Sequence, residues 1–258
     1  MAITKFRESQ IGKFLPKYFN NKTDVNSGLL FYIDGSNKTC YPGSGTTVFD
    51  LSGNSRNGTL INGTGFSTDA SGCFTFNGTN QYINFPHTPT NSTTSEHTLS
   101  AWFNWDGSGG GTDGRRFLIE SYRADNTGTP WQFSLWVQSS GQAGSVPRMQ
   151  VSSSPYQNLT GNTTIEANRW YNVTIVYSRN LLYGVQIYIN GMFDSEGVTV
   201  NNNTDYDGFN VGSYRGISTI ADNRWFSGKI SEMKIYNKAL TELEIVQNFN
   251  YSRIRHGV

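Results

Sequence analysis

The sequence predicts an all-β sandwich. Short apolar runs alternate with clusters of Gly, Asn, Ser and Thr, and the chain has 28 Gly, 14% aromatic and only 15% charged residues. Strand-forming residues separated by turn-forming residues give this profile, whereas long helices do not. The spacing of the runs favours a sandwich or a barrel over βαβ units.

The length and charge of the chain limit its class further. Sandwiches often reach ~200–250 residues as one domain, so 258 residues predict a single main domain. With 20 basic and 19 acidic residues, the chain has no general attraction for nucleic acids or membranes. No apolar run approaches the ~18 residues that span a bilayer. We therefore expect no nucleic-acid partner and no membrane partner.

The ends of the chain differ from its body. Residues 1–28 carry the basic residues Lys5, Arg7, Lys13 and Lys17, and Pro16 interrupts any helix. We interpret 1–28 as a basic anchoring arm, 29–250 as the sandwich and 251–258 as a C-terminal tail. The first residues contain neither a continuous apolar stretch nor a small-residue cleavage site, so we expect no secretory signal.

Twelve runs are candidate strands. One of them is followed by Asn190-Gly191, the preferred signal for a type I′ hairpin turn. The predicted strands are Leu29–Ile33, Gly58–Ile61, Cys73–Phe76, Tyr82–Phe85, Leu99–Trp105, Phe117–Ser121, Gln132–Gln138, Arg148–Val151, Tyr171–Ser178, Val185–Ile189, Gly208–Val211 and Lys229–Tyr236.

One short helix is predicted near the C-terminus. Thr241-Glu-Leu-Glu244 is a capping box, flanked by Leu240 and Ile245 as a hydrophobic staple. The helix should begin at Glu242, run toward Asn248 and pack against the sandwich.

Several motifs occur in the order typical of one family. The chain resembles concanavalin A-like/laminin-G (LamG) domains, and this resemblance implies an antiparallel β-sandwich of the jelly-roll kind. The motifs that carry it are Leu29-Leu-Phe-Tyr-Ile-Asp-Gly35, Asp50-Leu-Ser-Gly-Asn-Ser-Arg-Asn-Gly-Thr-Leu60, Phe76-Asn-Gly-Thr-Asn-Gln-Tyr-Ile83, Thr98-Leu-Ser-Ala-Trp102, Arg169-Trp-Tyr-Asn-Val173, Ile187-Tyr-Ile-Asn-Gly191 and Phe226-Ser-Gly-Lys-Ile230.

The C-terminal segment Phe249-Asn-Tyr-Ser-Arg-Ile-Arg-His-Gly-Val258 resembles the tail that follows such domains in structural proteins of bacteriophages. This resemblance implies a non-enzymatic virion structural protein, located on the capsid or tail after assembly in the host cytoplasm. It also implies contacts with other virion proteins and several copies or a homo-oligomer. The candidate assembly contacts are Lys5, Arg7, Lys13, Lys17, Arg253 and Arg255.

The sequence lacks recognisable catalytic groups. Glycosidases need two carboxylates ~5–5.5 Å or ~6.5–9.5 Å apart, and the family's enzymes supply them in an E-x-D-x-E strand that this chain lacks. Glu232 is the acid that we place within a strand, and we expect it to form a structural ion pair with Lys234 rather than to act as a general acid. We expect His87, His97 and His256 at the surface. The sequence therefore predicts no enzyme, with a glycan hydrolase of divergent acids as a distant third function.

No cofactor is expected, and calcium stays open. Asn80 and Gln81 occupy positions where calcium-binding relatives place their first ligands, but the later acidic cluster is missing. Cys40 and Cys73 are interpreted as free thiols, with a single bridge as the alternative.

Strand parity gives one candidate ligand site. Leu99, Ala101 and Phe103 share a face, so Trp102 points the opposite way. The same parity places three further aromatics outside the core: Trp136, Tyr188 and Trp170. Either these rings form an open face that stacks on sugars, or loops cover them as a second small core. The open face predicts a lectin-like adhesin for host surface polysaccharide, with Tyr122–Trp131 and Tyr214–Trp225 as further candidate loops.

Overall fold

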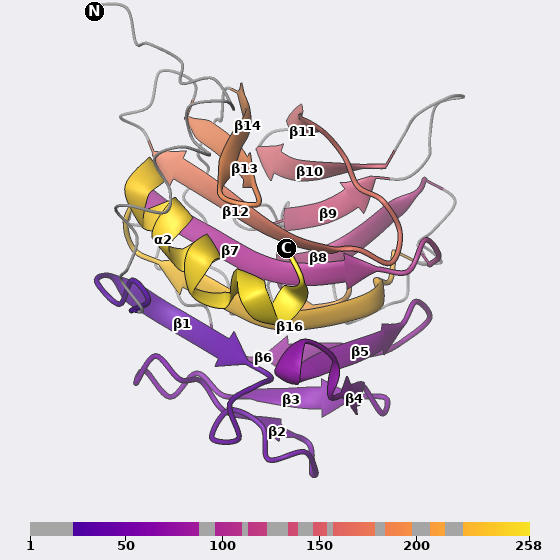
Figure 1. Cartoon of the computed structure of the whole chain (residues 1–258). Helices are drawn as coiled ribbons and strands as arrows, with labels where there is room; N and C mark the ends of the chain where they lie inside the picture. Colours follow the sequence, from indigo (N-terminus) through magenta and orange to yellow (C-terminus); the bar gives the residue numbers. More distant parts are fainter. Residues whose placement is uncertain are drawn as a thin grey trace, which may run out of the picture.

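The computed structural model describes residues 23–87, 96–109, 113–122, 134–138, 147–153, 157–178, 184–197, 207–214 and 224–258. Two antiparallel sheets face each other across one core (Figure 1). The all-β sandwich predicted from the sequence is therefore confirmed.

Sheet A contains eight described strands. Their order is β14-β13-β12-β7-β16-β5-β4. Strand β5 pairs with the N-terminal part of β16, and β1 pairs with its C-terminal part. The bounds are β1 Leu29–Asp34, β4 Gly65–Ser67, β5 Cys73–Asn77, β7 Glu96–Trp105, β12 Trp170–Ser178, β13 Val185–Ile189, β14 Met192–Gly197 and β16 Ser227–Tyr236.

Sheet B also contains eight described strands, in the order β11-β10-β9-β8-β15-β6-β3-β2. The bounds are β2 Thr47–Val48, β3 Gly58–Ile61, β6 Tyr82–Phe85, β8 Arg115–Tyr122, β9 Ser134–Gln138, β10 Arg148–Ser153, β11 Gln157–Thr164 and β15 Gly208–Val211. A one-turn 3-10 helix, η1 (Asp69–Ser71), precedes β5.

All twelve predicted strands are present, and four match their predicted bounds: β3, β6, β13 and β15. The sequence missed β2, β4, β11 and β14. These strands are very short or polar, as in Gln157-Asn-Leu-Thr-Gly-Asn-Thr-Thr164, and they lie at or next to sheet edges. A strand exposed on most of its surface needs no apolar alternation, so the pattern could not reveal it.

The core lies between the sheets, as strand parity predicts. Leu99, Ala101 and Phe103 of β7 all point into it. At its centre, Phe31 contacts Phe85 and Phe209 edge to face, with ring centroids 4.8 and 5.0 Å apart, an arrangement that aromatic rings favour. The alternating strand pattern therefore specifies which side of each sheet is buried in the sandwich.

The C-terminal helix is longer than predicted. Helix α2 (Glu242–Ser252) begins with the expected capping box between Thr241 and Glu244. It continues into the 3-10 helix η2 (Arg253–His256), so the tail is helical and packs on the outer face of sheet A (Figure 1). A second small apolar cluster forms beneath α2, and its buried members are Val25, Val176, Tyr188, Tyr236, Leu240 and Ile245. In the part of the chain that the structure describes, no helix is long and apolar enough to cross a membrane.

Residues 23–25 belong to the packed body, although the sequence assigns 1–28 to an arm. Gln247 donates a hydrogen bond to the carbonyl of Thr23 (2.8 Å), and the Val25 amide donates to Asn248 (3.0 Å). The Tyr236 hydroxyl donates to the carbonyl of Val25 (3.1 Å). The basic residues Lys5, Arg7, Lys13 and Lys17 lie outside the described residues.

A buried charge network joins both ends of the described chain to sheet A. The Lys234 ammonium, with 1% of its side chain exposed, lies 2.5 Å from Asp24 and 2.5 Å from Glu232. The Arg255 guanidinium then pairs with Glu232 and with Asp34. Burial alone would lower the pKa of Lys234, but the two carboxylates outweigh it and raise that pKa well above its usual value. The Glu232–Lys234 pair expected from the sequence is confirmed.

Replacing Lys234 with Ala should strongly destabilise the fold, because Asp24 and Glu232 would stay buried without their shared cation. Breaking a buried pair in this way costs ~3–5 kcal/mol, measurable as a lower free energy of unfolding in urea. The exposed Lys38 supplies a control, and Lys38→Ala should change stability by no more than about 0.5 kcal/mol. Equal stability of the two variants would contradict the conclusion that Lys234 stabilises the fold by neutralising Asp24 and Glu232.

Candidate functional site

The C-terminal segment covers part of the outer face of sheet A. Trp102 points away from the core, as parity predicts, but it is only 1% exposed. Its ring stacks on His256 at 3.9 Å with an interplanar angle of 3°, and on Phe249 at 5.6 Å. Tyr188 is buried in the cluster under α2. For these two rings the structure shows the second alternative, a small outer core, with α2 and η2 rather than a loop as its cover.

Trp136 lies on the outer face of sheet B and is also fully buried. Phe117 stacks on it at 5.1 Å, and the Arg115 guanidinium lies 5.3 Å from its ring. Its indole N–H donates to Gln150 and Gln138. Neither Trp136 nor Trp102 therefore presents an open face to a sugar in this structure.

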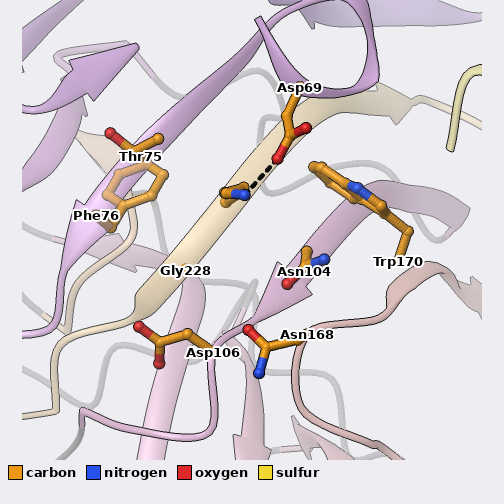
Figure 2. Close-up of a pocket in the computed structure, with 9 residues that line it drawn as sticks. Asp69, Thr75, Phe76, Asn104, Asp106, Asn168, Trp170 and Gly228 are labelled. Carbon is orange, nitrogen blue, oxygen red and sulfur yellow. Dashed lines mark hydrogen bonds and ion pairs between the residues drawn. The ribbon is translucent and has the colours of Figure 1, made fainter. Parts of the chain in front are cut away.

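A pocket of about 450 Å³ opens on sheet A beside η2 (Figure 2). Four of its residues are paired across adjacent strands: Trp170 with Asn104, Asn104 with Lys229, and Lys229 with Thr75. Paired residues point to the same face of a sheet. The complete lining is Asp69, Thr75, Phe76, Asn104, Asp106, Asn168, Trp170, Gly228 and Lys229.

Trp170 forms the aromatic wall of the pocket and is the one member of the predicted aromatic patch that lines it. It is half-buried, and its ring meets His256 edge to face at 4.9 Å. His256 is itself held by Ser231 (2.7 Å) and by the carbonyl of Ser252 (2.9 Å). The C-terminal segment therefore fixes the orientation of the indole.

Neutral polar groups surround this wall. Asn104 lies in β7, and Asn168 lies in the turn before β12, where its amide N–H donates to the carbonyl of Trp105 (2.7 Å). Neither carboxamide hydrogen-bonds another group in the described part of the chain. Each carboxamide therefore keeps an acceptor oxygen and two donor hydrogens for a ligand.

The charged groups of the pocket are engaged. The Lys229 ammonium is paired with the Asp69 carboxylate, as the dashed line in Figure 2 shows. Asp106 accepts hydrogen bonds from the Ser227 hydroxyl (2.7 Å) and from the amide and hydroxyl of Ser108 (2.8 Å each). Although burial alone would raise the pKa of Asp106, these bonds outweigh it and hold that pKa below its usual range.

The floor of the pocket requires a glycine. Gly228 has φ of +136°, and a Cβ there would lie 2.1 Å from the carbonyl oxygen of Asn104. Any side chain would therefore push β16 away from β7. Sequence reasoning found Trp170 but none of the other lining residues, because strand register brings them together.

The remaining candidate residues lie elsewhere. Asn80 bonds Asn77 (3.0 Å), and the Gln81 amide donates to the carbonyl of Gly63 (2.7 Å). No group of three or more His, Cys, Asp or Glu side chains that could hold a metal occurs among the described residues. Arg253 is exposed, whereas Arg255, a candidate assembly contact, is committed to Asp34 and Glu232 within the fold.

Several buried groups differ from the sequence expectations. His97 and His256 are buried rather than at the surface, because Tyr177 stacks on one at 4.3 Å and Trp102 on the other. Glu120, an additional strand acid that the sequence reasoning missed, is fully buried and accepts a hydrogen bond from Ser134.

The two cysteines are free and buried. Burial raises the pKa of Cys40 to about 12 and that of Cys73 to about 11, so both thiols stay protonated at neutral pH. The preferred interpretation of the sequence, two free thiols, is confirmed.

Residues 77–246 match the family model of the concanavalin A-like lectin/glucanases superfamily. The chain belongs to this superfamily. The matched region runs from β6 into the first half of α2 and includes every pocket residue except Asp69, Thr75 and Phe76. No curated protein matches the sequence.

Solved structures share the fold at low sequence identity. Domain 4 of an extracellular arabinanase from Geobacillus stearothermophilus, in complex with arabinotriose, is 18% identical with a TM-score of 0.60; the match covers 85% of this chain and 97% of that domain. Trypanosoma rangeli sialidase in complex with sialic acid is 16% identical with a TM-score of 0.62, covering 90% of this chain and 34% of the sialidase. The binding domain of Paraclostridial Mosquitocidal Protein 1 is 17% identical with a TM-score of 0.58, covering 87% of this chain and 52% of that one.

This chain thus spans about a third of the sialidases that it matches. At 15–18% identity these likenesses show the fold alone.

Acid should weaken the support of the aromatic wall. Burial first, and the charge of Arg255 second, lower the pKa of His256 to about 4 from its ordinary 6.5. Between pH 4 and pH 6.5 the unfolded state therefore binds more protons at His256 than the folded state does. The contribution of the neutral imidazole to the free energy of unfolding is complete above about pH 6.5 and is lost as the pH falls toward 4. The variant His256→Gln cannot titrate and should lose less stability over this window than the parent.

Thermal unfolding from pH 7 to pH 4 measures this difference, with the exposed His87→Gln as a control substitution away from the aromatic wall. His97, whose pKa burial lowers to about 3, retains part of the slope in both variants. A slope that does not change in His256→Gln would argue against this role of the imidazole.

Proposed function

We propose that this chain is a carbohydrate-binding domain that holds a glycan in the pocket on sheet A and does not hydrolyse it. The observation that carries the proposal is the combination of one fixed, half-buried indole with uncommitted carboxamides around a pocket of about 450 Å³. Specific ligand pockets typically combine apolar surface with a few well-placed polar groups.

The chemistry of a sugar fits this arrangement. One face of a pyranose or furanose ring presents C–H groups that pack on an aromatic ring, while its edge carries hydroxyls that both donate and accept hydrogen bonds. Trp170 supplies the aromatic surface. Asn104 and Asn168 supply carboxamides that can satisfy neighbouring hydroxyls.

The comparisons support the class of ligand. The superfamily is described by its lectins and glucanases. The arabinanase domain solved with arabinotriose is matched over 97% of its length, so its likeness extends over a domain of similar size.

The state of the carboxylates favours binding over hydrolysis. A glycosidase needs an acid that is protonated near neutral pH together with a second carboxylate. In the pocket, Asp106 has a lowered pKa and Asp69 is paired with Lys229. Glu232 pairs with Lys234 and Arg255 under the C-terminal segment.

Replacing Trp170 with Ala should weaken glycan binding at least tenfold, because a lost aromatic contact of ~0.5–1.5 kcal/mol adds to the lost apolar area. A glycan array would identify the ligand, and calorimetric titration would measure the change. Phe49→Ala, which removes an exposed ring outside the pocket, should change affinity less than twofold. Undiminished binding by Trp170→Ala would exclude this pocket as the site, and released sugar would exclude a non-catalytic role.

A second function, compatible with the first, is the bacteriophage virion structural protein implied by the sequence. It is supported by the basic residues between Lys5 and Lys17 and by the tail motif that begins at Phe249. Arg255 is occupied within the fold, which leaves Arg253 as the tail residue open to a neighbouring protein.

Deletion of residues 1–22 should then abolish incorporation into particles while the sandwich stays folded. The cut must spare residues 23–25, because Asp24 and Val25 are part of the packed body. Particle incorporation and unfolding midpoint are the two measurements. Normal incorporation of the truncated protein would refute the anchoring role.

A further inference from the structure

The charge of the pocket on sheet A restricts which glycans it can hold. Its lining contains two carboxylates, Asp69 and Asp106, and one cation, Lys229. The Lys229 ammonium is already paired with Asp69, and Asp106 stays ionised because its pKa is lowered. The lining therefore carries a net charge of about −1 at neutral pH, and no arginine among the described residues belongs to it.

The aromatic wall adds no positive charge. The ring behind Trp170 belongs to His256, whose pKa of about 4 keeps it neutral near pH 7. Arg169, next to Trp170 in the chain, pairs with Glu166 at 2.6 Å and does not line the pocket. Arg116 interacts electrostatically with Asp106, but its Nε–H donates to the carbonyl of Ser108 and it does not line the pocket. A carboxylate on a ligand would thus find Asp106 without a cation in the lining that could pair with it.

The groups that remain available are uncharged. They are the carboxamides of Asn104 and Asn168 and the indole face of Trp170. A site built to hydrogen-bond hydroxyls discriminates strongly against ligands that leave its polar groups without partners. These groups match hydroxyls and apolar C–H surface and offer no charged partner for an acidic substituent.

We infer that the pocket selects neutral glycans, made of uncharged pentose or hexose units, and rejects uronic and sialic acids. This inference rests on the proposed function and names its ligand class. Asp106 is the main residue that enforces the selection, with the Asp69–Lys229 pair removing the one cation that an acidic sugar could use. At an effective dielectric constant of ~20, repulsion from Asp106 would weaken the binding of a ligand carboxylate held ~6 Å away by about a hundredfold. Because the pocket is partly open to solvent, we expect a smaller loss of affinity, of about tenfold or more.

The test uses the full chain and glycans that differ only in charge. Calorimetric titrations would compare α-1,4-galactotriose with trigalacturonic acid and lactose with 3′-sialyllactose, and a glycan array would extend the comparison to other neutral and acidic pairs. We expect the neutral member of a bound pair to bind at least tenfold more tightly. Raising the salt from about 0.05 M to about 0.5 M should narrow this difference, since salt screens the repulsion and leaves neutral binding unchanged.

Two variants separate charge from shape. Asp106→Asn keeps the shape of the side chain and removes its charge, so the neutral-to-acidic ratio should fall to threefold or less. Asp69→Asn removes the partner of Lys229. It should therefore raise the affinity for the acidic glycan of each pair without any change at Asp106. The exposed Glu242→Gln, at the start of α2, should leave the ratio as it is in the parent.

The outcomes distinguish this inference from the function on which it rests. Acidic glycans that bind as tightly as their neutral partners, in a way that Trp170→Ala abolishes, would overturn the selection and leave the carbohydrate-binding function standing. A chain that binds no member of the array would overturn both. Selection that persists unchanged in both Asp variants would show that shape rather than charge excludes the acidic sugars, and would also overturn the inference.

Discussion

The parallel stack of Trp102 on His256 is the contact on which the outer face of sheet A depends. It places η2 against the strands, and Phe249 of α2 packs on the same indole. The imidazole that closes this contact also meets the ring of Trp170. One buried residue near the C-terminus therefore covers the middle of the sheet and sets the edge of the pocket, so stability and the shape of the candidate site share a single support.

The two sheets have different outer surfaces. On sheet A, a helix covers one part of the face (Figure 1). The pocket lies on the same face, where Trp170 meets His256 of η2. On sheet B, hydrogen-bonded polar side chains lie across adjacent strands, as where Asn84 donates to Asn210 and Tyr122 at 2.9 Å each. The carboxylate of Glu120 belongs to this second surface, next to Ser134. The ligand site proposed above and this buried polar row are thus on opposite layers of the sandwich.

The composition, the spacing of the apolar runs and the ordered motifs were enough to predict the fold class, and strand parity predicted the direction of Trp102. The sequence did not predict what covers the ring of Trp102. The covering residues belong to the C-terminal part of α2 and to η2, and they are held there by packing on that ring. The capping box at Thr241 predicted where α2 begins, whereas nothing local marks its extension to Ser252. Of the residues that line the pocket, the sequence predicted one, Trp170, as part of an aromatic face. Its polar partners come from β7, β16 and the turn before β12, and their proximity follows from register, which a single sequence does not specify.

The hydrogen bonds of Val25 have a consequence for the order in which parts of the chain fold. They join residues 211 and 223 positions apart, to Tyr236 and Asn248, so each closes a loop of nearly the whole chain. Closing so long a loop is entropically costly, and contacts of this separation slow folding. We therefore expect both ends to dock last, on a sandwich that is already formed, and the wall of the pocket to be completed in that final step.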